Sequence, residues 1–153
     1  MPILSKFTFY QMTHVLFICT GNYYRSRFAE IYFNYLTAKQ TSSLIARSRG
    51  FRMNPEKNKG VLSPHALSYL ELLNIETYDV GIPTKLEDAD LRNATRIIAM
   101  DEKEHRDMMV RFFPEWIDKV EFWHFEDDYL VSPSQVLPAL KGKVEALVQS
   151  ILR

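Results

Sequence analysis

The sequence predicts a single α/β domain, a three-layer sandwich in which a four-stranded parallel β-sheet lies between two layers of helices. Four short apolar segments, each typical of a buried strand, alternate with segments of helical periodicity along the chain. The chain has 153 residues, which is the usual size of one domain. No internal repeat or low-complexity segment in the sequence indicates a second unit.

The four strand segments are short and rich in β-branched and aromatic residues, which favours strands over helices. The first is almost continuously apolar, a pattern typical of a strand buried on both faces. The strands are expected at residues 14–19, 43–48, 96–100 and 120–123. Residues 1–13 show no clear period, so we interpret them as a short N-terminal extension and residues 14–153 as the domain.

The helical segments repeat apolar residues at intervals of three and four. One helix is expected to begin at Ser63-Pro64, a capping serine followed by a first-turn proline. Another is expected to be capped by Asp101, to turn Phe112 inward and to end before Pro114. Four of the five helices are expected at residues 26–39, 85–92, 101–113 and 133–152. The remaining helix begins at residue 64 and ends before a loop at residues 76–84.

Composition and charge exclude several classes of protein. The chain has 19 basic and 19 acidic residues, so no net charge favours binding to nucleic acid or to an anionic membrane. No run of about 18 apolar residues and no signal peptide is present, so we expect a cytoplasmic protein. The single cysteine, Cys19, cannot form an internal disulfide and is free for chemistry. No residue cluster has the spacing of metal ligands, so neither a metal nor a cofactor is expected.

One segment, which runs from the first strand into the first helix, carries the predicted chemistry. Its residues are Cys19-Thr20-Gly21-Asn22-Tyr23-Tyr24-Arg25-Ser26. The backbone N–H groups of such a loop and the positive end of the helix dipole bind an oxyanion. The same field, together with the Arg25 cation, favours the thiolate of Cys19. The segment therefore predicts a phosphate-binding loop with a cysteine nucleophile beneath the phosphate.

Other residues complete a two-step phosphate ester hydrolysis. The planar guanidinium of Arg25 can hold two phosphate oxygens, and Ser26 can donate a hydrogen bond to the thiolate. Gly21 and Asn22 tolerate the positive φ that a tightly wound loop needs. Cys19 would attack phosphorus and water would release the phosphate. The leaving oxygen needs a proton, for which Asp127 in the acidic loop after the fourth strand is the candidate donor.

These residues resemble the low-molecular-weight protein tyrosine phosphatase family. The resemblance rests first on the strand before Cys19, the Gly-Asn pair inside the loop, and Arg25-Ser26 at its end. It continues at Ser48-Arg49-Gly50, Ser63-Pro64-His65-Ala66, Met100-Asp101 and Glu126-Asp127-Asp128-Tyr129. It implies a four-stranded parallel sheet and a monomeric cytoplasmic phosphatase. The implied substrate is phosphotyrosine in a protein or a small aryl phosphate, and inorganic phosphate is the product.

Carried over by position, the resemblance implies Cys19 as nucleophile, Arg25 as phosphate clamp and Asp127 as general acid. Loop support is implied for four polar residues, which are Asn22, Ser26, Ser48 and Asp101. Contact with the phosphate or the rest of the substrate is expected for several loop residues and one residue at the mouth, which are Thr20, Gly21, Asn22, Tyr23, Tyr24, Ser26 and Tyr129.

The chain departs from the family pattern at several positions, and Tyr23 separates it from the phosphoarginine phosphatases of the family. Tyr24 stands where the family usually has a second cysteine, so the family's protective disulfide cannot form. Asp128 replaces the usual proline after the acid, which leaves Asp127 and Asp128 as alternatives for that role. Tyr23 offers an aromatic wall where related phosphoarginine phosphatases carry a small threonine. Arg27 replaces the usual proline after the loop.

Three other functions fit part of this pattern. A catalytically weak phosphopeptide-binding module would keep the loop without turnover. A phosphoarginine phosphatase would share the fold and the nucleophile. A phosphocysteine carrier of a sugar-uptake system would share the strand and cysteine but needs neither Arg25 nor Asp127. The presence of all the catalytic groups disfavours the binding module, and the aromatic Tyr23 favours a phenyl substrate over phosphoarginine.

Overall fold

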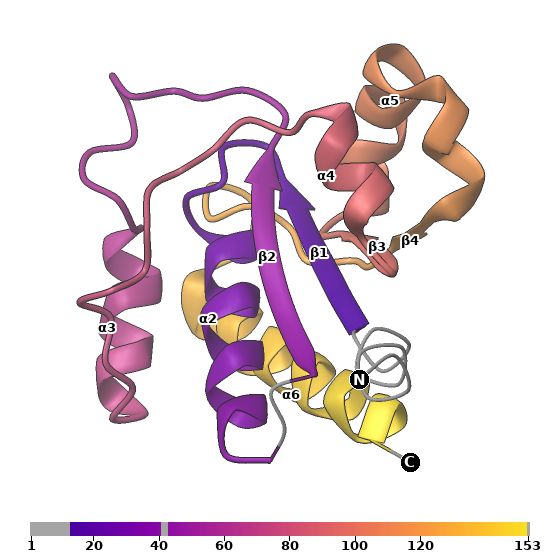
Figure 1. Ribbon diagram of the computed structural model, residues 1–153. Helices are drawn as coiled ribbons and strands as arrows, with labels where there is room; N and C mark the ends of the chain where they lie inside the picture. Colours follow the sequence, from indigo (N-terminus) through magenta and orange to yellow (C-terminus); the bar gives the residue numbers. More distant parts are fainter. Residues whose placement is uncertain (1–12, 41–42, 153) are drawn as a thin grey trace.

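The structure is a computed structural model that describes residues 13–40 and 43–152. Its centre is a four-stranded parallel β-sheet in the order β2-β1-β3-β4. The strands are β1 (Thr13–Cys19), β2 (Leu44–Gly50), β3 (Arg96–Ala99) and β4 (Val120–Phe122). Helices cover both faces of the sheet (Figure 1), so the predicted fold class is confirmed.

Two helical layers enclose the sheet. The helices are α2 (Arg25–Ala38), α3 (Pro64–Leu72), α4 (Asp88–Asn93), α5 (Glu102–Phe112), α6 (Pro133–Leu152) and a short 3₁₀ helix, η1 (Pro114–Lys119). Buried side chains of α2, α3 and α6 form one apolar cluster with the sheet, and those of α4 and α5 form a second with the other face. Among the helices that the structure describes, none combines the length and apolar character that a membrane span requires.

The side chains of β1 alternate between these two clusters, as expected for a strand. Val15, Phe17 and Cys19 pack in the cluster beneath α2 and α6. Leu16 and Ile18 pack in the cluster with α4 and α5. The nearly continuous apolar run therefore forms a strand buried on both faces, and Cys19 is directed toward the layer that contains α2.

The sheet register brings the carboxyl ends of three strands to the same edge. Cys19 pairs with Gly50 of β2, and Ile18 pairs with Ala99 of β3. The chain enters α2 at Arg25, shortly after β1 ends. Ligands of open parallel sheets bind at this edge, which places residues 19–26 where a binding loop is expected.

Some element boundaries differ from those predicted. β2 extends to Gly50 rather than residue 48, because Arg49 and Gly50 still pair with β1. Residues 114–119 form η1 instead of a plain connection, since Pro114 ends α5 but fits the first turn of a new helix. The predicted N-terminal extension at 1–13 lies outside the described residues except for Thr13, which begins β1.

The predicted inner face of α5 is partly wrong. Met109 is fully buried, but Phe112 is 47% exposed. Phe112 is the last residue of the helix. The Arg111 guanidinium lies 5.4 Å from the Phe112 ring, a contact typical of a partly solvated aromatic side chain.

Candidate active site

Cys19 and Ser26 meet across the loop that connects β1 to α2. The Sγ of Cys19 lies 2.9 Å from the Oγ of Ser26, which belongs to the first turn of α2. Both residues are buried. The hydroxyl of Ser26 is therefore placed to donate a hydrogen bond to a thiolate, as the sequence predicts.

Asn22 holds the loop in its wound shape. It is fully buried and adopts a φ of 52°, in the left-handed region that asparagine tolerates. Its Nδ2 donates to the hydroxyls of Ser26 at 3.0 Å and Ser48 at 2.8 Å. Its Oδ1 accepts from the backbone N–H of Thr84 at 2.8 Å. The structure thus brings together the predicted support residues Asn22, Ser26 and Ser48.

A second group of buried polar side chains continues this network. Ser48 donates to the carboxylate of Glu30 at 2.5 Å, and Arg27 pairs with the same carboxylate at 3.4 Å. Arg27 also donates to the carbonyl oxygens of Val61 and Gly81. Burial raises the pKa of Glu30 and lowers that of Arg27. Arg27, a departure from the family pattern, therefore ties two loops to the helix that follows the phosphate-binding loop.

The loop itself offers unused backbone donors. Within residues 13–40 and 43–152, the amide N–H groups of residues 20–24 donate no hydrogen bond to a protein acceptor. Free N–H groups between a strand and a helix are suited to an oxyanion.

A small cavity of about 70 Å³ adjoins Cys19. Since one water occupies about 30 Å³ in the liquid, this cavity admits a group of a few heavy atoms. Its lining residues are Cys19, Gly21, Tyr23, Tyr24, Arg25, Lys57, Asn58, Asp127 and Asp128. Sequence analysis did not identify Lys57 and Asn58, which lie in a polar loop without any recognisable pattern.

Arg25 is almost completely buried beside this cavity. Its Nη1 donates to Glu104 and to the carbonyl oxygen of Phe125, both at 2.9 Å. Its Nη2 donates to Glu104 at 3.1 Å and lies 3.3 Å from the carboxylate of Asp127. Although burial opposes the charge, the bond to Glu104 and the Cys19 charge raise the pKa of Arg25. Its Nε has no acceptor in the part of the chain that the structure describes.

Glu104 is a site residue that sequence analysis missed. Besides pairing with Arg25, it accepts hydrogen bonds from the Thr20 hydroxyl and from Nε2 of His105. Nδ1 of His105 accepts from the N–H of Asp101, which leaves Nε2 as the donor. Although burial raises the pKa of Glu104, hydrogen bonds from His105 and Arg25 hold it well below its ordinary value. The sequence carries no signal for it, because Glu102 and Glu104 both lie in the first turn of α5 and look alike in the sequence.

The other predicted residues lie in different environments. The Thr20 side chain is turned toward Glu104 and does not line the cavity. The Tyr23 side chain lines the cavity, and its hydroxyl donates to the carbonyl oxygen of Lys59 at 2.5 Å. Asp101 is buried, and burial raises the pKa of its carboxyl while the nearby Arg25 charge lowers it.

The acidic loop contributes two cavity residues. Asp127 pairs with Arg25 and accepts a hydrogen bond from the N–H of Asp128 at 2.9 Å. Asp128 is more exposed. Tyr129 is 68% exposed, and the ammonium of Lys57 lies 5.5 Å from its ring centre. Tyr129 does not line the cavity, so the structure does not bring this predicted contact into the site.

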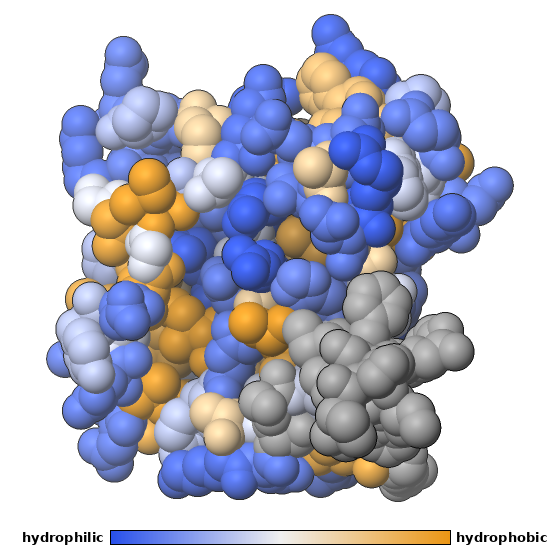
Figure 2. All heavy atoms as spheres, in the orientation of Figure 1, coloured by the Kyte–Doolittle hydropathy of each residue, from blue (hydrophilic) through white to orange (hydrophobic). Residues whose placement is uncertain are grey.

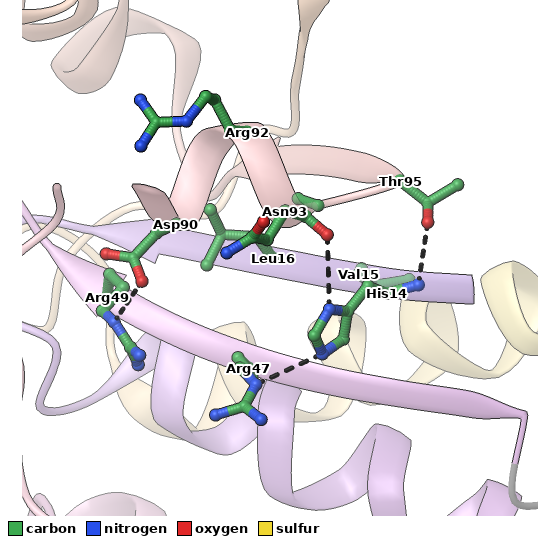
Figure 3. Close-up of a pocket in the computed structure, with 10 residues that line it drawn as sticks. His14, Val15, Leu16, Arg47, Arg49, Asp90, Arg92, Asn93 and Thr95 are labelled. Carbon is green, nitrogen blue, oxygen red and sulfur yellow. Dashed lines mark hydrogen bonds and ion pairs between the residues drawn. The ribbon is translucent and has the colours of Figure 1, made fainter. Parts of the chain in front are cut away.

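A larger cavity of about 860 Å³ lies elsewhere, between β2 and α4 (Figure 3). Its polar groups mainly contact one another: Arg49 pairs with Asp90 at 3.1 Å, and Arg47 donates to His14 at 3.2 Å. Figure 3 shows Arg92 extending away from these groups, and Figure 2 shows a hydrophilic surface over β2 and α4. Cys19 does not line this cavity. Among the described residues, no group of three or more potential ligands is arranged to hold a metal ion.

The parallel sheet and the loop at its carboxyl edge place the chain in the class of α/β phosphatases. The family model described as "Low molecular weight phosphotyrosine protein phosphatase" matches residues 14–153, and the chain belongs to this family.

Relatives of the chain are named for different substrates. A "Protein-arginine-phosphatase" of Bacillus subtilis (strain 168) is 29% identical over 136 residues, which cover 89% of this chain and 85% of the relative. The crystal structure of a low molecular weight protein tyrosine phosphatase from T. tengcongensis has a TM-score of 0.76 at 25% identity, over 90% of this chain and 99% of that one. The crystal structure of a YwlE mutant from Bacillus subtilis has a TM-score of 0.76 at 22% identity, and the match covers 92% of this chain and 99% of that one.

Proposed function

We propose that this protein hydrolyses phosphotyrosine, in a protein or as a small aryl phosphate, through a phosphocysteine intermediate. The supporting observation is the cavity beside Cys19, because its lining residues Gly21, Tyr23 and Tyr24 have unused backbone N–H groups and its lining residue Arg25 has a free Nε. Buried donors without acceptors are unfavourable unless a ligand accepts their hydrogen bonds. A phosphoryl group supplies several acceptor oxygens and fits a space of this size.

In the first step, the Cys19 thiolate attacks phosphorus. A sulfur–phosphorus bond forms, and the bond from phosphorus to the aryl oxygen breaks. A protonated Asp127 gives its proton to the leaving oxygen. The loop amides and Arg25 stabilise the charge on the non-bridging oxygens.

In the second step, water attacks the phosphocysteine. The Asp127 carboxylate accepts a proton from the water while the sulfur–phosphorus bond breaks. Ser26, whose Oγ lies 2.9 Å from Sγ, donates to the departing thiolate. Inorganic phosphate then leaves and the starting state is restored.

The ion pair between Asp127 and Arg25, at 3.3 Å, belongs to the ligand-free enzyme in this mechanism. A bound phosphoryl group competes for the same Nη2, which releases Asp127 toward the leaving group. The Tyr23 ring at the cavity wall offers a surface for the phenyl ring of the substrate.

Phosphoarginine is the second candidate substrate. Its support is the 29% identical relative named a protein-arginine-phosphatase. Asp127 and Asp128 at the cavity also suit a substrate that carries a guanidinium next to its phosphate. The aromatic Tyr23 favours the aryl substrate.

The test is an assay with para-nitrophenyl phosphate, followed by peptides that carry phosphotyrosine, phosphoserine or phosphoarginine. Wild type is expected to release phosphate, fastest from the phosphotyrosine peptide, and Cys19→Ser is expected to release none. Faster turnover of the phosphoarginine peptide would replace the proposed substrate. Phosphopeptide binding without hydrolysis by wild type would favour a binding module.

We further propose that the protein acts as a monomer in the cytoplasm, without a metal. A single free thiol, needed in its reduced form, suits a reducing compartment. Sedimentation of the active protein tests the oligomeric state, and turnover in the presence of a chelator tests the metal.

A further inference from the structure

Tyr24 immediately precedes Arg25 and is buried, with 4% of its surface exposed. Its ring packs edge-on against His65, with the ring centroids 6.3 Å apart. Its hydroxyl oxygen is inaccessible and has no hydrogen-bond partner among the described residues. A buried hydroxyl without a partner is unfavourable, so its presence indicates a partner that the protein alone does not supply.

The hydroxyl of Tyr24 shares this property with Nε of Arg25, the proposed phosphate clamp. In the described part of the chain, three buried side-chain atoms lack a partner: the Tyr24 hydroxyl, Nε of Arg25 and Nε of Arg27. Tyr24 and Arg25 both line the small cavity next to Cys19, whereas Arg27 does not. Two donors without partners therefore belong to residues that line the same cavity as Cys19.

We propose that the Tyr24 hydroxyl is a phosphate ligand, which donates a hydrogen bond to an oxygen of the phosphoryl group that Cys19 attacks. The inference rests on the proposed phosphatase function. A phosphoryl group carries several oxygens that each accept hydrogen bonds, so it can accept from the Tyr24 hydroxyl and from Nε of Arg25 at the same time. The cysteine that the family usually has at position 24 would be a much weaker donor.

The electrostatic surroundings keep this group in its donor form. Burial raises the pKa of Tyr24 above its ordinary value, and the charge of Asp128 acts in the same direction, against the smaller lowering effect of Arg25. A phenol with a raised pKa keeps its proton near neutral pH, where it can act as a donor. Asp127 and Asp128 line the same cavity, but neither accepts the hydrogen bond of Tyr24 in this structure.

The test compares Tyr24→Phe with a matched tyrosine in the same helical region. Tyr32 is equally buried, at 4% exposed, but its hydroxyl already donates to Glu145 at 2.5 Å. For wild type and both variants, binding of inorganic phosphate is measured by calorimetry and as inhibition of para-nitrophenyl phosphate hydrolysis. The melting temperature is measured without phosphate.

Tyr24→Phe is expected to bind phosphate about tenfold more weakly than wild type, because it loses one hydrogen bond to an anion. Its melting temperature without phosphate should equal or exceed that of wild type, since an unpartnered buried hydroxyl has been removed. Tyr32→Phe should show the opposite: wild-type phosphate binding and a lower melting temperature.

Wild-type phosphate affinity in Tyr24→Phe would overturn the inference, because the hydroxyl would then make no bond to the phosphate. A lower melting temperature of that variant without phosphate would also overturn it, because the hydroxyl would then have a partner in the ligand-free protein. These results are distinct from a failure of the proposed function. If wild type itself neither hydrolyses para-nitrophenyl phosphate nor binds phosphate in the calorimeter, the phosphatase proposal is overturned.

Discussion

Glu104 holds the guanidinium of Arg25 with both of its carboxylate oxygens. Nη1 of Arg25 donates to Oε1 at 2.9 Å and Nη2 donates to Oε2 at 3.1 Å. A bidentate pair of this kind fixes the plane of the guanidinium as well as its position. Because Glu104 also accepts from the Thr20 hydroxyl, one carboxylate joins α5 to the start of the phosphate-binding loop. Glu104 is therefore a positioning residue for Arg25.

Glu104→Gln is expected to lower kcat about tenfold without raising KM or the inhibition constant of phosphate. The glutamine loses the charged bidentate pair, so Arg25 is less well fixed for the transition state. It also removes a negative charge near the bound phosphate, which favours ground-state binding. Steady-state kinetics with para-nitrophenyl phosphate measure both constants. Glu102→Gln is the control, because Glu102 lies on the same helix and pairs with Arg106 at the surface. An unchanged kcat in Glu104→Gln would contradict the positioning role.

Glu104 also predicts how stability depends on pH. Its pKa in the folded protein is lowered from the ordinary value of 4.5, so it binds fewer protons folded than unfolded. Its contribution to stability is therefore complete above pH 4.5 and is lost as the pH falls through its lower folded value. Melting temperatures of wild type and Glu104→Gln should differ at neutral pH and converge in acid below 4.5. If the difference in melting temperature between wild type and Glu104→Gln became larger in acid, the lowered pKa of Glu104 would be contradicted.

Asp127 and Asp128 are distinguished by their dependence on the leaving group. Asp127→Asn should reduce turnover of phenyl phosphate by about 10²-fold or more, because phenolate needs a proton to leave. The loss should be much smaller with para-nitrophenyl phosphate, whose leaving group is stable as an anion. Asp128→Asn, which changes a more exposed side chain, should stay close to wild type with both substrates. The reverse pattern would assign the acid role to Asp128.

Gly50 allows β2 to approach the phosphate-binding loop. A Cβ at this position would lie 2.7 Å from the backbone nitrogen of Asn22 and 2.9 Å from the carbonyl carbon of Gly21. Backbone atoms cannot rotate away, so Gly50→Ala should shift the loop and reduce kcat/KM about 100-fold. Gly142→Ala is the matched control, because a Cβ there meets no atom within 4 Å and alanine favours the helix. A fully active, equally stable Gly50→Ala protein would contradict this account.

Local sequence patterns were sufficient to predict the sheet and the core of the site. The apolar run that ends at Cys19, the loop and the start of α2 are contiguous, so hydrophobic period, turn residues and charge specify them without knowledge of distant contacts. Asn22 was identified for the same reason, since its tolerance of positive φ is a property of the residue itself.

Residues brought in by tertiary packing could not be predicted in this way. Glu104 is 79 residues from Arg25 in the chain, and nothing in the local pattern of α5 distinguishes it from a solvated helix charge. The burial of Tyr24 depends on its packing against His65 from another segment, so the sequence alone allowed a surface aromatic residue. The prediction that Phe112 is buried was wrong because it used local spacing alone. Phe112 continues the apolar spacing of α5, but the helix ends at this residue and leaves the side chain partly exposed.

The single cysteine predicts how the enzyme responds to peroxide. Cys19 is the only cysteine in the sequence, so a sulfenic acid formed on it has no second thiol in the chain with which to form a disulfide. Continued exposure should carry the sulfur to the sulfinic and sulfonic acids, which thiols do not reduce. The activity recovered with dithiothreitol should therefore fall as the peroxide treatment is lengthened, and the mass of Cys19 should rise by two or three oxygens. Tyr24→Cys, which restores the cysteine usual in the family at this position, should retain recovery over the same times. Complete recovery of wild type after prolonged treatment would show that the sulfenic acid is protected by something other than a neighbouring thiol.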